Sequence, residues 1–263
     1  MTALSYCGQT VRTHDPDRFL LGLFAPADRR DALWALYAFN HEVAKTREVV
    51  TETRLGLIRL QWWKDAVAGI FNGQTPLKHQ VVEPLAEAIA RYNLPREPFE
   101  TLMYAREFDL EDRLPADLAG MAAYAEFTSL PLLKLALAVT GEGDAGAKEA
   151  ATGYALAGLL RAVPAHAAQR RCYLPEKLLQ QEGMDQYKLY DRKEVDKIKP
   201  AVKAVATFAS GLLEKPAAKG QAALMRHMAQ MYLKRLETAG YDVFSSTFHA
   251  PPPLMALRLW WNS

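Results

Sequence analysis

The sequence has only two cysteines, Cys7 and Cys172, among its 263 residues. Neither belongs to a CxxC pair or to a Cys/His ligand spacing, so the chain has no disulfide framework and no structural zinc motif. An excess of one charge is also missing, because 32 basic residues are interleaved with 30 acidic ones. A nucleic-acid-binding surface is therefore not expected, and the cysteine content fits a reducing compartment.

The N-terminal stretch MTALSYCGQTVRTHDPDRF has neither a basic start followed by an apolar run nor the acid-poor composition of a transit peptide. No uninterrupted apolar stretch reaches the roughly 18 to 20 residues that cross a bilayer. We therefore expect a cytoplasmic chain, or a matrix protein already processed. Membrane contact, if made, is expected to be peripheral, at the inner face of the membrane.

Alternating β-branched segments are also almost absent, whereas helix-forming residues dominate the long segments. The sequence predicts an all-α protein with one domain over residues 1–263, in which residues 1–14 and 251–263 are peripheral tails. The expected helices cover residues 26–50, 54–71, 76–92, 97–112, 118–139, 145–162, 193–214 and 220–240.

Two segments carry a family resemblance. The first is DRFLLGLFAPADRRDALWALYAFN followed by LGLIRLQWWKDAV, and the second is GYALAGLLRAVPAHAAQRRCYLP at residues 153–175. Both resemble the signature segments of the squalene and phytoene synthase family. That resemblance covers residues 15 to 259. It implies an isoprenoid (terpenoid) synthase fold, a single helical bundle around a central cavity.

In that family, aspartates four residues apart lie on two facing helices and hold the magnesium ions that bind a prenyl diphosphate. Here the first aspartate pair falls on Ala44 and Glu48. In the second segment the family aspartates fall on Ala162 and His166, and the preceding asparagine falls on Gly158. Alanine supplies no ligand and imidazole is a poor donor to a hard cation, so the resemblance predicts that the metal chemistry is lost.

The runs NHEVAKTRE, IRLQWWKDAV and LLRAVPAHAAQRRCYLP resemble one branch of the family more closely than its working synthases. This non-catalytic branch contains mitochondrial respiratory complex I assembly factor six and its bacterial relatives. The resemblance implies a subunit or assembly intermediate of respiratory complex I as partner. A lipid or an isoprenoid is the expected ligand of the cavity.

Twelve candidate site residues follow from the two segments. Those expected to line the cavity are Tyr37, Asn40, His41, Ala44, Glu48, Gly158, Ala162 and His166. Those expected to bind an anion or diphosphate are Arg161, Arg170, Arg171 and Tyr173, because guanidinium groups suit phosphate oxygens. Plainer interpretations stay open, in which Glu48 is a solvated helix-end charge, His166 is structural, and the arginines complement a helix dipole.

Two further features have open interpretations. Trp62 and Trp63 differ by about 100° around a helix, so one ring is expected in the core and the other at the surface; Trp260 and Trp261 pose the same question. An exposed ring suits a partner surface or a membrane interface. The acidic run Glu107, Asp109, Glu111 and Asp112 is expected to be a solvated helix end rather than a metal site.

Three functions therefore compete. The leading hypothesis is a pseudo-enzyme that serves as an assembly or binding factor and needs no cofactor. The alternative is an active prenyltransferase of isoprenoid biosynthesis, which would need magnesium. The third is a module that carries a lipid.

Overall fold

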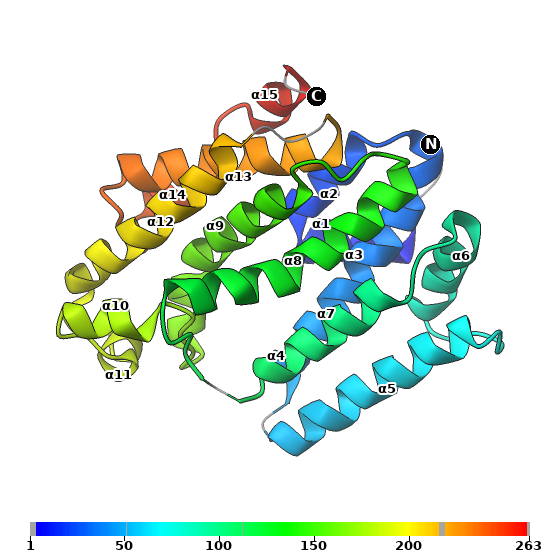
Figure 1. Cartoon of the computed structure of the whole chain (residues 1–263), viewed down its shortest axis with the longest axis horizontal. Coiled ribbons are helices and arrows are strands. Elements are labelled where there is room, and N and C mark those ends of the chain that lie inside the picture. The colour runs from blue at the N-terminus through cyan, green and yellow to red at the C-terminus, as the bar shows by residue number, and fades with distance from the viewer. Residues whose placement is uncertain (1–3, 51, 112, 216–218, 262–263) are drawn as a thin grey trace. The chain divides into compact units, whose positions relative to one another are not determined.

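The computed structural model describes residues 4–50, 52–111, 113–215 and 219–261, and its secondary structure is helical (Figure 1). The α-helices are α1 (Tyr6–His14), α2 (Pro16–Leu23), α3 (Arg30–Ala44), α4 (Thr46–Val49), α5 (Thr53–Phe71), α6 (Val82–Tyr92), α7 (Glu97–Phe108), α8 (Leu118–Thr140), α9 (Ala147–Ala168), α10 (Glu176–Gln181), α11 (Gln186–Tyr190), α12 (Lys199–Glu214), α13 (Gln221–Thr238), α14 (Ser246–His249) and α15 (Met255–Trp261). Two short 3-10 helices, η1 (Ala27–Arg29) and η2 (Val195–Ile198), precede α3 and α12.

The chain forms two compact units. Unit 1 contains residues 1–111, 130–144 and 219–221, and unit 2 contains residues 112–129, 145–218 and 222–263. The long helix α8 contributes residues to both units. The prediction of a single domain stays a prediction.

The core of unit 1 is organised around α3. Its residues 33–39 are all buried, so this helix is covered on every side. Phe39 meets Trp63 of α5 edge to face at 5.5 Å between ring centroids, and it meets Phe99 of α7 at 5.6 Å. Residues 6–14, expected as a tail, form α1, whose Cys7 and Val11 enter the same core. The helix that carries the first motif is thus held rigidly by packing.

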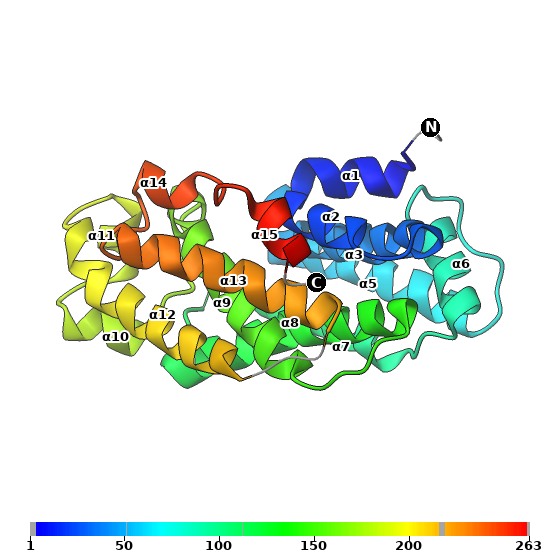
Figure 2. The same cartoon turned by 90° about the horizontal axis from the view of Figure 1, so that it is seen from above.

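In unit 2, α9 and α12 lie side by side (Figures 1 and 2). Their approach is close at Gly153, where an added Cβ would lie 2.6 Å from Leu213 of α12. A side chain at this position would therefore require Leu213 to move. Pro164 lies within α9, near the end that carries the second motif.

Most expected helices are present, with different ends. α5 ends as predicted at Asn72-Gly73, and Gly73 has φ 72°. The start predicted at Pro76 is wrong, because α6 begins at Val82 and His79 Nδ1 accepts the Val81 amide hydrogen at 3.1 Å. The start predicted at residue 193 is too early, since α12 begins at Lys199 with Pro200 in its first turn. Asp112, the end predicted for the helix that begins at Glu97, lies outside the described residues.

Among the described residues, α8 meets the length and composition expected of a membrane-spanning helix, with a mean hydropathy of 1.3 over its most apolar window. This differs from the expectation that no stretch would qualify. However, 56% of that window is buried inside the protein. A core helix meets the same criteria, so the finding is weak evidence for a span.

Candidate functional site

The first motif occupies one face of α3. Tyr37, Asn40, His41 and Ala44 lie at positions i, i+3, i+4 and i+7, which project from the same side of a helix. Glu48 does not continue this face, because α3 ends at Ala44 and Glu48 is an exposed residue of the separate short helix α4. Glu48, which has the one carboxylate of the degenerate motif, therefore lies on a different helix from Ala44.

Tyr37 and Asn40 place unpaired polar atoms in the interior of unit 1. Their exposed fractions are 2% and 7%. Neither the Tyr37 hydroxyl nor Asn40 Oδ1 has a hydrogen-bond partner among the described residues. Burial raises the pKa of the Tyr37 phenol well above its ordinary value, and nearby Arg18 opposes that rise. Tyr37 is thus a buried, neutral hydrogen-bond donor.

His41 stacks on His14 of α1, with ring centroids 4.5 Å apart and planes inclined by 11°. Burial lowers the pKa of His41, and the neighbouring His14 and Lys45 lower it further. The imidazole of His41 is therefore disfavoured as a cation at neutral pH. The first motif thus carries neutral groups on the face where its family carries carboxylates.

Three other acidic side chains near α3 and α5 are engaged in ion pairs. Glu42 accepts hydrogen bonds from Lys45 Nζ at 2.5 Å and from Arg59 Nη2 at 2.8 Å. Glu107 pairs with Lys64, and Asp109 pairs with Arg106 at 3.2 Å. Within the described part of the chain, no group of three or more His, Cys, Asp or Glu side chains could hold a metal ion. Lys45, next to Ala44, would also repel a divalent cation.

The second motif lies on α9 in unit 2. Gly158, Ala162 and His166 are spaced by four residues and share one half-buried helix face. A Cβ added at Gly158 would meet no atom within 4 Å. There is consequently open space at Gly158, the position at which the family carries an asparagine.

Aromatic rings surround the end of this face. The His166 ring lies 4.7 Å from the ring of Tyr173, which stacks on Tyr124 of α8 at 5.2 Å. The guanidinium of Arg161 lies over the ring of Tyr232 of α13, 3.8 Å from its centroid. Tyr124 and Tyr232 were not among the predicted site residues, because they lie far from the motif in sequence. A tyrosine in an expected helix carries no local signal of such contacts.

Contacts of the predicted anion-binding residues are known for some of them. Arg170 is exposed, lies 3.6 Å from Asp191 and faces the Tyr190 ring. Arg171 is half-buried. The structure thus brings His166 and Tyr173 together, whereas Arg170 pairs with the segment that follows α11. The prediction that the α3 and α9 faces meet across a central cavity stays a prediction.

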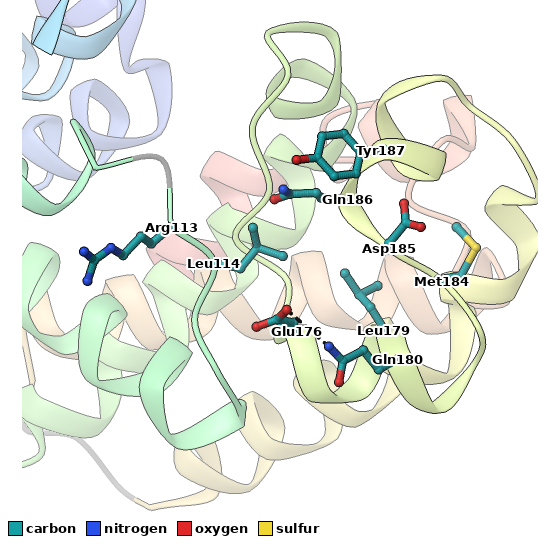
Figure 3. Close-up of a pocket in the computed structure, with 9 residues that line it drawn as sticks. All are labelled: Arg113, Leu114, Glu176, Leu179, Gln180, Met184, Asp185, Gln186 and Tyr187. Atoms are coloured by element: carbon teal, nitrogen blue, oxygen red, sulfur yellow. Dashed lines mark hydrogen bonds between the residues drawn. The ribbon is translucent and has the colours of Figure 1, made fainter.

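A surface pocket in unit 2 contains none of the predicted residues. It has a volume of about 370 Å³ and lies between the segment carrying Arg113 and Leu114 and the helices α10 and α11 (Figure 3). The Glu176 amide donates to Pro115 O at 2.9 Å, which fixes the start of α10 against that segment. Glu176 and Gln180 are joined by a 3.2 Å hydrogen bond at its edge (Figure 3).

The helical fold, the two motif faces and their spacing together define an isoprenoid-synthase-type protein. A model of the squalene/phytoene synthase family matches residues 11–256, and the chain belongs to this family. The crystal structure of squalene synthase HpnC from Alicyclobacillus acidocaldarius is similar, with a TM-score of 0.75 and 21% identity, covering 90% of this chain and 93% of that one. The predicted family and the all-α isoprenoid-synthase fold are confirmed.

The chain is also similar over nearly its whole length to proteins named NADH dehydrogenase (ubiquinone) complex I, assembly factor 6. The protein from Bos taurus is 29% identical, and that from Rattus norvegicus is 30% identical. Each comparison covers 98% of this chain and 81% of the relative. The predicted resemblance to this branch of the family is confirmed.

Proposed function

We propose that this protein is a non-catalytic member of the squalene/phytoene synthase family that assists the assembly of the membrane NADH dehydrogenase, respiratory complex I. The observation that carries the proposal is its similarity to assembly factor 6 from two mammals over 98% of the chain. The expected partner is a complex I subunit or an assembly intermediate.

The chemistry of the two motifs supports the absence of catalysis. Magnesium is held by oxygen ligands, and Ala44 and Ala162 offer none. Glu48 is exposed on a separate helix, and Glu42 is engaged with two cations. Losing a single positioned electrostatic group commonly raises a reaction barrier by about 2.7 to 4 kcal/mol. Losing most ligands of a metal cluster would therefore abolish ionisation of a prenyl diphosphate.

Two measurements test this function. Deletion of the gene in its host is expected to lower the amount of assembled NADH dehydrogenase on native gels, with carotenoid and hopanoid levels unchanged. The purified full chain, incubated with magnesium and farnesyl or geranylgeranyl diphosphate, is expected to form no condensation product. Robust product formation would support an active prenyltransferase and overturn the proposal.

We further propose that the protein retains a lipid or isoprenoid ligand. Open space at Gly158 and the ring pair of His166 and Tyr173, all in unit 2, support this. Apolar and aromatic surfaces suit an isoprenoid chain.

A matched pair of glycine substitutions tests the ligand. Gly158 and Gly211 both lie within helices and both have open space around an added Cβ, but Gly211 is exposed on α12. Gly158→Leu is expected to remove lipid that co-purifies with the protein, as measured by mass spectrometry, whereas Gly211→Leu retains it. A wild-type protein that is consistently free of lipid would contradict the ligand proposal.

We place the protein in the cytoplasm, in peripheral contact with the inner face of the membrane. Leu257, Trp260 and Trp261 of α15 are exposed, and tryptophan rings favour the membrane interface. Flotation with lipid vesicles is expected to recover the wild-type chain but less of the Trp260→Ser, Trp261→Ser variant. Equal recovery of the two proteins would contradict this location.

A further inference from the structure

Helix α5 has a second apolar face that stays partly exposed in the described structure. Leu55, Ile58 and Trp62, here called the α5 ridge, lie at positions i, i+3 and i+7 and are exposed by 47%, 57% and 39%. Gly56, Leu60 and Trp63, on the opposite side, are buried. Unit 1 therefore uses one apolar face of α5 for its own core and leaves the other in solvent. Exposed apolar side chains gathered in this way are typical of an interaction surface.

The ring of Trp62 is held in place by contacts within the protein itself. It meets Trp63 edge to face, with centroids 4.9 Å apart, and lies 5.4 Å from the ring of His79. Trp63 is in turn packed against Phe39 of the core. A rigid, partly exposed tryptophan loses little conformational entropy on binding, which is a property of interface hot spots.

Two arginines flank the α5 ridge. At 100° per residue, Arg54 and Arg59 lie about 70° to either side of its centre line. Arg59 is oriented by its 2.8 Å ion pair with Glu42 of α3, and Arg54 is exposed. Helix α5 contains three basic residues, Arg54, Arg59 and Lys64, and one acidic residue, Asp65. The apolar stripe thus has one arginine on each border, and Asp65 lies on the Arg54 side, beyond Trp62.

A groove between α5 and α7 adjoins the α5 ridge; the two helices lie side by side in unit 1 (Figure 1). The groove has a volume of about 470 Å³ and is lined by Lys64 and Asp65 of α5 and by Glu100, Met103 and Tyr104 of α7. Tyr104 is 66% exposed. The carboxylates of Asp65 and Glu100 would be repelled by an anionic lipid surface. A protein partner is therefore favoured over a membrane.

We propose that the α5 ridge and the adjoining groove bind an amphipathic helix of a partner protein, one with aliphatic side chains on its apolar face, carboxylates opposite Arg54 and Arg59, and basic side chains opposite Asp65 and Glu100. This is the helix-in-groove mode, in which anchors at i, i+3 and i+7 meet apolar side chains and border charges set the register. The inference rests on the proposed assembly function, because the complex I client would supply this helix.

Peptide binding to the full chain tests the surface directly. The probes are two synthetic helical peptides with identical leucine faces, which differ only at the positions facing Arg54 and Arg59, where one has glutamates and the other lysines. Fluorescence anisotropy is expected to show binding of the glutamate peptide at least about tenfold tighter than the lysine peptide. Ile58→Glu is expected to weaken the glutamate peptide by about thirtyfold or more, as for a hot-spot residue. Leu23→Glu, at an exposed apolar residue of α2, is the control and is expected to leave binding unchanged.

A charge reversal makes the test specific. Arg54→Glu is expected to weaken binding of the glutamate peptide and to strengthen binding of the lysine peptide. Circular dichroism should show that this variant has the same helix content as the wild type. Equal binding of both peptides, or unchanged binding by Ile58→Glu, would overturn the proposal. Two other results would also overturn it. If the wild type floats with phosphatidylglycerol vesicles and Ile58→Glu does not, the α5 ridge binds a membrane. If the wild type forms a dimer in analytical ultracentrifugation and Ile58→Glu does not, the α5 ridge binds a second copy.

Complementation separates this proposal from the proposed function. If the gene deletion lowers assembled NADH dehydrogenase, Ile58→Glu is expected to restore it poorly and Leu23→Glu fully. Full restoration by Ile58→Glu would overturn the docking surface and leave the assembly function standing. If the deletion leaves NADH dehydrogenase intact, the assembly function fails, and the peptide measurements alone decide the surface.

Discussion

Replacing Glu42 by glutamine removes the charge that joins α3 to α5. Glu42 is 7% exposed, and its two carboxylate oxygens pair with Lys45 and Arg59. Glutamine has nearly the same shape but cannot satisfy two cations, because its amide nitrogen is a donor. The substitution therefore isolates the electrostatic contribution with little change in packing.

The expected cost lies between two known limits. Breaking a fully buried ion pair costs about 3 to 5 kcal/mol, and an exposed pair is worth about 0 to 1 kcal/mol. The side chains of Lys45 and Arg59 are 27% and 33% exposed, so water recovers part of the loss. We expect Glu42→Gln to lower the free energy of unfolding by about 2 kcal/mol, which corresponds to a fall in Tm of about 4 to 8 °C.

Thermal and urea unfolding of the purified chain measure this change. Glu48→Gln, at the exposed carboxylate on α4, is the control and should stay within about 0.5 kcal/mol of the wild type. A double-mutant cycle with Arg59→Gln should give a coupling of about 1 kcal/mol, because the two charges are in contact. A Glu42→Gln protein as stable as the Glu48→Gln control would refute the reasoning.

Three further predictions concern the motifs and the buried titratable groups. Isothermal calorimetry should detect no magnesium binding by the wild type. The variant with Ala44→Asp, Glu48→Asp, Ala162→Asp and His166→Asp should bind magnesium only weakly, because neighbouring groups that would orient the new ligands are also lost. Binding by this variant as tight as in a working synthase would contradict the prediction. Burial raises the pKa of Cys172 to about 12 and that of Cys7 to about 11, so neither thiol should react with a thiol reagent at about pH 8 until the protein is unfolded. Because the pKa of His41 is lowered from 6.5 chiefly by burial, the folded state binds fewer protons there than the unfolded state, and stability should fall as the pH drops below about 6.5. Proton NMR should give a His41 midpoint below 6.5, and His41→Gln should reduce the pH dependence; an unchanged profile would argue against His41 as its source.

The fold could be predicted from local patterns because helix propensity and periodicity depend on residues close together in the sequence. The end of α5 at Asn72-Gly73 was predicted because glycine readily adopts the positive φ found there. The start of α6 was not predicted correctly. Pro76 permits a helix to begin there, but the His79 side chain accepts the Val81 amide hydrogen, and residues 76–81 form a loop instead. Short helices such as α10 and α11 carry too few residues for a periodic signal.

The prediction for the tryptophan pair illustrates how much a sequence can say. Because Trp62 and Trp63 are adjacent in a helix, their side chains had to lie on different faces. In the structure Trp63 is buried and Trp62 is exposed. Which ring would be buried depended on Phe39 and Phe99, which come from other helices. The same limit applies to Tyr124 and Tyr173, whose stacking joins segments about fifty residues apart.

The sequence by itself determined the family, the helical class and the replacement of motif aspartates by Ala44, Ala162 and His166, because these properties reside in residue identity and spacing. Only the tertiary structure decided that Glu42 is held between two cations and that Leu55, Ile58 and Trp62 stay in solvent. Ion pairing and burial depend on which helices meet, and that is set by packing between segments distant in the chain.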